Sequence, residues 1–268
     1  MALPENAEQT QSGGTYAVVR DRFEPWDFMR VSEVLEHCLG LHVLDARQLA
    51  RRAPGIVAEA IPGFQAERLA QNLRSVGTTT IIVPTRLLMP LPVEFQCRGM
   101  VFQEGRLCFL GEDDRKSIAL EPEAFTILCA AQVFREKEVG LSTTAKAFVY
   151  ATMGYSRIRV QDVPITSKGS KETWPFVLCL VGNNPPIQVR IYADKFNFSC
   201  LERHQVERTE DAFPHLVKRL SECCPSVKKN PGVDALLQGK PLKKSLRFGK
   251  ERDFEDYAHW FLQVSLLV

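Results

Sequence analysis

Hydrophobic residues recur at helical spacing between residues 28 and 76, and this pattern predicts three amphipathic helices. In each segment the apolar residues lie three or four positions apart, which places them on one helix face. The three faces are Val31, Val34, Leu35, Cys38 and Leu39; Leu41, Ala46, Leu49 and Ala53; and Ala66, Leu69, Ala70 and Leu73. Pro54-Gly55 is expected to end the second helix, and Gly77 to cap the third in the left-handed region.

Two β-branched runs enclose these helices. Residues 15–20 predict one strand, and residues 78–83, the densest β-branched run in the chain, predict a buried strand. The expected order is strand, helix, helix, helix, strand, so that helices cover a small sheet. We assign this domain to residues 15–92 and expect the polar residues 1–14 to form a disordered tail without the apolar core of a signal peptide.

The spacing of this segment is similar to that of a known small domain. The matching positions are Gly40, Leu41, Ala46, Arg47, Leu49, Ala53, Pro54, Glu59, Ala66, Glu67, Leu69, Leu73 and Gly77. Residues 15–84 thereby resemble the C-terminal domain of the bacterial ribosomal stalk protein, a fold shared with the small adaptor of Clp proteases. Most matching positions are core or turn positions, so the resemblance implies a fold and not a function.

The resemblance also implies where a binding surface would lie. The stalk domain recruits translational GTPases through basic residues, and the equivalent positions here are Phe28, Glu33, Glu36, Leu44 and Arg47. Only Arg47 keeps its positive charge, whereas Glu33 and Glu36 carry the opposite charge. A partner surface that is attracted to the stalk domain would therefore be repelled at these two positions. We carry over no binding residue, and we expect the Glu33/Glu36 helix face to serve a different interaction.

The second half contains a weak internal repeat. Residues 107–111 and 118–120, followed by Glu123 and Phe125, recur in the same order as residues 178–182 and 189–191, followed by Asp194 and Phe196. Polar or Pro-rich turns separate the strands, which predicts two β-hairpins, 107–125 and 178–196. The match is either a true repeat or the ordinary likeness of hairpins. If it is a repeat, both hairpins are expected in one antiparallel sheet, with a mobile loop between them at residues 167–171.

The last quarter predicts two amphipathic helices. Phe213, Leu216, Val217 and Leu220 share one face, and Phe254, Tyr257, Ala258, Phe261 and Leu262 share another, after the expected cap Asp253. We expect both helices to cover one side of the sheet. The chain is therefore predicted to be an α+β protein: a small stalk-like helix and sheet sandwich, then an antiparallel β-hairpin domain at residues 93–268 with C-terminal helices.

Composition narrows the function only a little. Of 268 residues, 45% are hydrophobic and 25% are charged, and the net charge is +2, which is ordinary for a globular protein and favours no partner. No apolar run approaches the length of a transmembrane helix. Most of the eight cysteines lie in apolar runs, which is typical of reduced cysteines in a cytoplasmic protein.

Candidate chemistry is sparse. His37-Cys38 with His42, and Cys200 with His204, lack the paired spacing of a zinc site. The chain has no nucleophile elbow, no P-loop and no dinucleotide-binding glycine motif. We expect no metal and no cofactor, and we favour a non-catalytic protein, although a catalytic site assembled from distant residues stays open.

One charge cluster stands out. Between residues 228 and 252, eight basic residues face two acidic ones, and Phe248 lies among them. Such a segment could neutralise phosphates and stack a base, lie on another anionic surface, or form a solvated loop between helices. The candidate anion-binding or nucleic-acid-binding residues are Lys228, Lys229, Lys243, Lys244, Arg247 and Lys250.

The sequence therefore leads to two hypotheses. The first is a non-catalytic protein–protein interaction or scaffold protein whose partner is another protein. The alternative is a nucleic-acid-binding or ribosome-associated protein that uses the basic segment 228–252. The two differ in salt dependence, because phosphate-driven affinity falls steeply with ionic strength.

Overall fold

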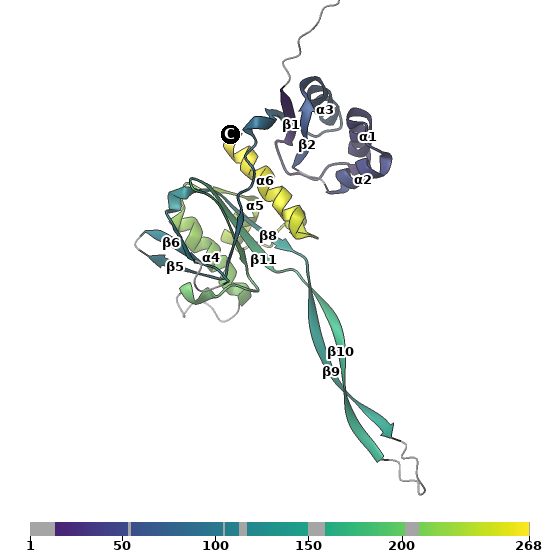
Figure 1. The fold of residues 1–268 in the computed structure, drawn as a ribbon, viewed down its shortest axis with the longest axis vertical. Coiled ribbons are helices and arrows are strands. Elements are labelled where there is room, and N and C mark those ends of the chain that lie inside the picture. The colour runs from purple at the N-terminus through teal and green to yellow at the C-terminus, as the bar shows by residue number, and fades with distance from the viewer. Residues whose placement is uncertain are drawn as a thin grey trace, which may run out of the picture.

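A computed structural model of the chain describes residues 14–52, 55–103, 105–112, 117–149, 159–201 and 209–267 (Figure 1). The chain contains both helices and antiparallel or mixed sheets, with strands β4 (Glu94–Cys97) to β12 (Pro186–Tyr192) in one run and helices α4 (Thr209–Cys223) to α6 (Glu251–Leu267) after it, which confirms the α+β class. The expected tail lies outside the described residues except for Gly14, and so does Pro54.

The N-terminal part is a three-stranded antiparallel sheet with three helices on one face. Its elements are β1 (Thr15–Arg20), α1 (Phe28–Leu39), α2 (Val43–Arg52), β2 (Ile56–Pro62), α3 (Gly63–Ser75) and β3 (Thr80–Pro84). The strand order is β2-β1-β3. The side chain of Asp27 caps α1 by accepting from the backbone N–H groups of Met29 and Arg30, and Gly40 ends it at φ +65°.

Two expectations for this part were wrong. The sequence did not predict β2, which lies between α2 and α3 in the chain and pairs with β1. The strand expected at residues 78–83 is β3, and it is half-buried because it lies at the edge of the sheet. The three expected helices are confirmed, and Gly77 has the expected left-handed conformation, at φ +87°.

The rest of the chain is built around a central mixed sheet. The short strands are β4 (Glu94–Cys97), β5 (Gly99–Gln103), β6 (Arg106–Leu110), β7 (Ser117–Leu120), β13 (Lys228–Lys229) and β14 (Arg247–Phe248). The longer ones are β8 (Phe125–Val133), β11 (Phe176–Asn183) and β12 (Pro186–Tyr192). The central order is β13-β8-β11-β12-β4, and β14 also pairs with β8. β4, β13 and β14 pair in parallel, so the sheet is mixed and not purely antiparallel.

Both expected hairpins form, but in different sheets. β6 and β7 pair with each other in a small separate sheet of order β5-β6-β7, whereas β11 and β12 lie in the central one. The expectation of one shared sheet was wrong. The two hairpins do share a core, because Phe125 and Phe196 are both buried in the same hydrophobic cluster.

The segment between the hairpins is a long two-stranded ribbon and not a loop. β9 (Arg135–Val149) and β10 (Arg159–Thr173) pair antiparallel along their whole lengths and project from the body (Figure 1). Ser167 pairs with Leu141, and Lys171 with Lys137, so the expected loop at residues 167–171 is strand.

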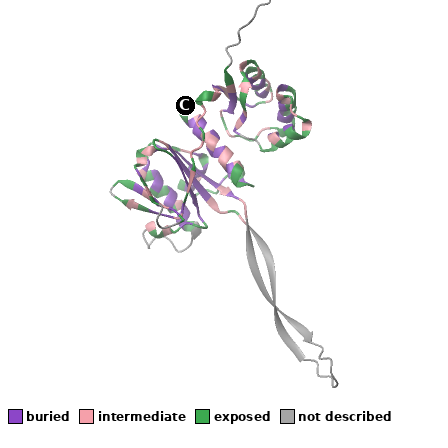
Figure 2. Cartoon of the chain, in the orientation of Figure 1, coloured by how far each residue is buried: buried purple, intermediate pink, exposed green. Residues whose placement is uncertain are grey.

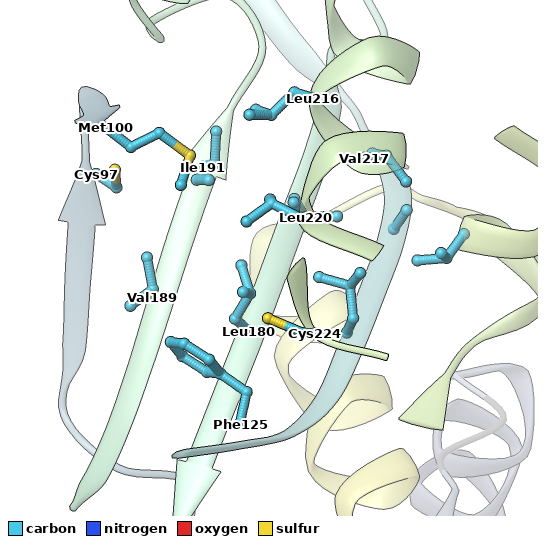
Figure 3. Packing of buried hydrophobic residues seen from close by; sticks show 14 of the residues in the cluster. Cys97, Met100, Phe125, Leu180, Val189, Ile191, Leu216, Val217, Leu220 and Cys224 are labelled. Carbon is cyan, nitrogen blue, oxygen red and sulfur yellow. The ribbon is translucent and has the colours of Figure 1, made fainter. Parts of the chain in front are cut away.

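Helices cover the two opposite faces of the central sheet. On β11, Leu178 and Leu180 pack in the cluster that contains α4 (Thr209–Cys223) and α5 (Pro231–Leu237), while Val177, Cys179 and Val181 pack in the cluster of α6 (Glu251–Leu267). This follows from the two-residue period of a strand. In Figure 3, Leu216 and Leu220 of α4 lie against the strands that carry Leu180 and Ile191. The expectation that both C-terminal helices share one side was therefore wrong.

Helix α6 lies between the two sheets (Figure 1). Ala17, Val19 and Val83 of the N-terminal sheet join the same buried cluster as Phe254, Tyr257 and Trp260. The Trp260 indole N–H donates to the backbone oxygen of Arg20 at 2.7 Å. Figure 2 shows the resulting band of buried residues through the central strands and the inner helix faces. The domain boundary between residues 92 and 93 stays a prediction. Helix α6, from the second part, packs against the sheet of the first part.

Candidate functional site

A cleft of about 750 Å³ lies between α2 and the segment 244–249, and we call it the basic cleft. The two walls are about 200 positions apart in the sequence. Its basic lining residues are Arg20, Arg47, Arg51, Arg52, Lys244 and Arg247, and its acidic ones are Glu24 and Asp253. The excess of positive charge makes it a candidate anion-binding site.

One wall is a single exposed face of α2. Leu44, Arg47, Gln48 and Arg51 lie at helical positions i, i+3, i+4 and i+7, and all four line the cleft. The opposite face buries Ala46 and Ala50 in the N-terminal core. The helical periodicity that buries these alanines therefore turns Arg47 and Arg51 outward.

The other wall is a short strand and the 3-10 turn before it. Leu246 and Phe248 are buried in the cluster around α6, whereas Lys244 and Arg247 are exposed. β14 pairs with the edge of β8, and the backbone oxygen of Phe248 accepts from Phe134 N at 2.9 Å. The two cations are thus held on a fixed backbone.

Two of the six cations are engaged within the protein. Arg52 pairs with Asp256 at 2.5 Å and with Asp253 at 3.8 Å. Arg20 is buried, donates to the backbone oxygen of Glu24, and lies over the rings of Phe23 and Trp26. Burial lowers the pKa of Arg20 to about 10, although Asp21 and Glu24 act in the opposite direction.

The other four basic side chains are available to bind an anionic ligand. Within the described part of the chain, Arg47, Arg51, Lys244 and Arg247 form no ion pair. The Arg51 guanidinium lies 5.5 Å from the centre of the Phe28 ring, which holds it at one end of the α2 face. Four such charges in one cleft attract an anion more strongly than scattered surface charges do.

The structure brings only part of the predicted basic segment to this cleft. Lys244 and Arg247 line it, whereas Lys228, Lys229, Lys243 and Lys250 do not. Lys228 and Lys229 form β13, which pairs with β8 at Ile127 and Leu128. Segment 228–252 is also not a plain solvated loop, because it contains β13, α5 and β14.

Phe248 cannot serve as a stacking platform. Its side chain is 7% exposed and packs against the rings of Phe254 and Tyr257. The expectation that it might stack a base was therefore wrong, because strand β14 turns it toward the core. Glu33 and Glu36 are exposed on α1, as an interaction face requires, but neither lines the basic cleft.

Sequence reasoning missed Arg51 and did not connect Arg47 with residues 244–247. The signal for the α2 face was present in its helical spacing, but nothing in the sequence places this face opposite β14. The described residues also contain no group of three or more His, Cys, Asp or Glu side chains that could hold a metal ion. All eight cysteines are free.

Comparisons with protein-family models, with curated proteins and with solved structures found no match. None of the described helices combines the length and the apolar character needed to cross a membrane.

Proposed function

We propose that the protein is a non-catalytic interaction protein that holds an anionic partner in the basic cleft. The observation that carries this proposal is the meeting of Arg47 and Arg51 from α2 with Lys244 and Arg247 from the far end of the chain. None of the four is used in an ion pair within the described residues. A scaffold role also suits the packing of α6, whose residues share one buried cluster with residues of both sheets.

Another protein is the preferred partner. The cleft walls carry exposed Leu44 and Pro25 beside the arginines, and such a mixture of apolar and basic groups is typical of a protein–protein interface. The free cysteines support the proposed cytoplasmic location, since reduced thiols persist there.

Nucleic-acid binding through segment 228–252 is the second candidate. One observation favours it: β13 and β14 both pair with the same edge of β8, at residues 127–128 and 132–133. Lys228 and Arg247 therefore lie along one edge of the sheet, about 17 Å apart at the rise of a strand. A phosphate backbone could follow this edge.

The resemblance of residues 15–84 to the ribosomal stalk domain is a proposal about fold. The three helices between β1 and β3, packed on one face of the sheet, support it. We propose no stalk-like activity, because Arg47 is the single basic residue at the positions that the resemblance points to.

Fluorescence polarisation of the full chain with labelled poly-glutamate and with labelled oligouridine tests the proposal. We expect poly-glutamate to bind, and the double variant Arg47→Glu with Arg247→Glu to lose that binding. Arg74→Glu is the matched control, because Arg74 is exposed on α3 away from the cleft. Equal binding by wild type and the double variant would refute the cleft as the site.

The salt dependence separates the two candidates. If the ligand contacts only the four cations of the cleft, the slope of log affinity against log salt concentration is about −3. If it also contacts lysines of segment 228–252 outside the cleft, such as Lys228, the slope is steeper. If oligouridine binds with the steeper slope and Lys228→Glu weakens it, the nucleic-acid candidate is supported. If Lys228→Glu has no effect on either probe, the basic cleft alone accounts for binding.

A further inference from the structure

We infer that the basic cleft takes a short extended segment of a partner protein in which acidic residues flank an apolar side chain. This inference rests on the proposed function and specifies its ligand. It follows from the order of groups along α2, from the aromatic rings of the cleft and from its two acids.

The groups on α2 run along one line from an apolar end to a basic end. Leu44 is 64% exposed at the start of the helix, Arg47 and Arg51 follow one and two turns later, and Phe28 lies against Arg51. An exposed leucine in a cleft gains free energy when an apolar group covers it. A uniformly charged ligand would leave that leucine uncovered.

The length of this face fits a few residues. Seven positions separate Leu44 from Arg51, which is about 10 Å along a helix. An extended peptide covers this distance with about three residues. Lys244 and Arg247 on the opposite wall can then bind carboxylates on the alternate side of the same segment.

The aromatic rings of the cleft are not available for bases. Phe248 is buried. The Phe23 ring packs edge-on against the Tyr257 ring, with 4.7 Å between the ring centres. The guanidinium of Arg20 lies over the Phe23 ring, 5.2 Å from its centre. Single-stranded nucleic acids bind proteins largely by stacking on exposed rings, so this cleft lacks a main source of that affinity.

The acidic lining also favours a peptide. Glu24 is exposed at the cleft, and Asp253 lines it beside Arg52. These carboxylates disfavour a uniformly charged polyanion of either kind, and they can accept hydrogen bonds from the backbone N–H groups of a peptide.

The test uses three labelled octapeptides and oligouridine with the full chain. The first peptide has seven glutamates and a central leucine, the second has glycine in place of the leucine, and the third has glutamines in place of the glutamates. We expect the leucine peptide to bind about fivefold more tightly than the glycine peptide. The glutamine peptide should bind weakest, because it carries no charge for the four cations.

Two variants locate the contacts. Leu44→Asp should remove the preference for leucine, and the exposed position together with the first helical turn tolerates an aspartate. Arg47→Glu should weaken both acidic peptides by roughly tenfold. Arg74→Glu should leave all affinities unchanged, and circular dichroism checks that each variant is folded.

The outcomes distinguish the two proposals. Equal binding of the leucine and glycine peptides would overturn the inference while leaving the anion-binding cleft in place. Tighter binding of oligouridine than of any peptide, weakened by Arg47→Glu, would also overturn it and assign the cleft to nucleic acid. If Arg47→Glu leaves the affinity for every probe unchanged, the proposed function itself is wrong.

Discussion

The side-chain amide of Asn230 forms both hydrogen bonds that a neighbouring strand would form with Ala130. The Ala130 N–H donates to Asn230 Oδ1 at 2.9 Å, and Asn230 Nδ2 donates to the Ala130 oxygen at 3.0 Å. The amide thereby fills the gap between β13 and β14 along the edge of β8. Oδ1 also accepts from Val233 N, so the same side chain begins α5.

Asn230→Ala is expected to lower the free energy of unfolding by about 2–4 kcal/mol, because the buried N–H and oxygen of Ala130 and the N–H of Val233 lose this partner. Asn230→Asp should cost at least as much, since it turns a carboxylate oxygen toward the Ala130 oxygen. Urea unfolding measures both changes. Gln71→Ala, at an exposed position on α3, is the control and should change stability by less than about 0.5 kcal/mol. A small effect of Asn230→Ala would mean that water replaces the amide.

The contact between Gly55 and Trp260 leaves no room for a methyl group. A Cβ at residue 55 would lie 2.0 Å from Trp260 Cγ. Gly55→Ala should therefore displace the indole and lower stability by about 1–3 kcal/mol. Gly249→Ala is the matched control, because a Cβ there meets nothing within 4 Å. Thermal unfolding compares the two, and equal melting temperatures would show that α6 shifts freely.

Arg190 is a buried cation held by two carboxylates. Its Nη1 lies 3.0 Å from Glu94 and 3.0 Å from Glu255, and the side chain is 1% exposed. Arg190→Met should destabilise the fold by about 3–5 kcal/mol, because it leaves carboxylates facing an apolar side chain. The triple variant that adds Glu94→Gln and Glu255→Gln should recover part of the loss. No recovery, measured by denaturant unfolding, would mean that arginine packing matters more than its charge.

Buried thiols predict a loss of stability in alkaline solution. Burial raises the pKa of Cys97 to about 12 and that of Cys179 to about 11, from a usual value of 9.0. Above pH 9 the unfolded chain releases these protons while the folded chain retains them, so the free energy of unfolding falls as pH rises. Two such thiols cost about 2 kcal/mol between pH 8 and pH 10.

Urea unfolding at the two pH values, with a reducing agent present, measures this loss. Cys179→Ala should make it smaller, whereas Gln71→Ala, which removes no titratable group, should leave it unchanged. An identical loss in all three proteins would assign the pH dependence to other groups.

The sequence predicted the elements that carry strong periodicity. The faces of α1, α3, α4 and α6 were read correctly because their apolar residues repeat at helical spacing over several turns. β2 was missed because Ala58 and Ala60 weaken its alternation, and α5 because seven residues are too few to show a period. The ribbon of β9 and β10 was missed because Ser167-Lys168-Gly169-Ser170-Lys171 has the composition of a loop.

The sequence indicated basic residues on each wall of the basic cleft, but not that the two walls meet. Arg247 was named from its cluster and Arg47 from the stalk resemblance, but each half is an ordinary charged surface alone. Their meeting depends on how β14 joins the edge of β8 and how α6 packs on the N-terminal sheet, which are long-range contacts. Phe248 was misjudged for the same reason, since its burial depends on Tyr257 and Phe254.

The position of α6 between the two sheets has a consequence for synthesis. Every strand whose apolar side chains α6 covers precedes it in the chain, from Ala17 and Val19 onward. During translation those strands therefore emerge with one apolar face exposed to solvent, and they stay so until residues 251–267 leave the ribosome. The N-terminal helices can fold onto their own sheet face earlier, because cluster residues such as Val31, Leu35 and Leu69 are already present. The synthesis of α6 thus lets a single helix cover both exposed surfaces in one step.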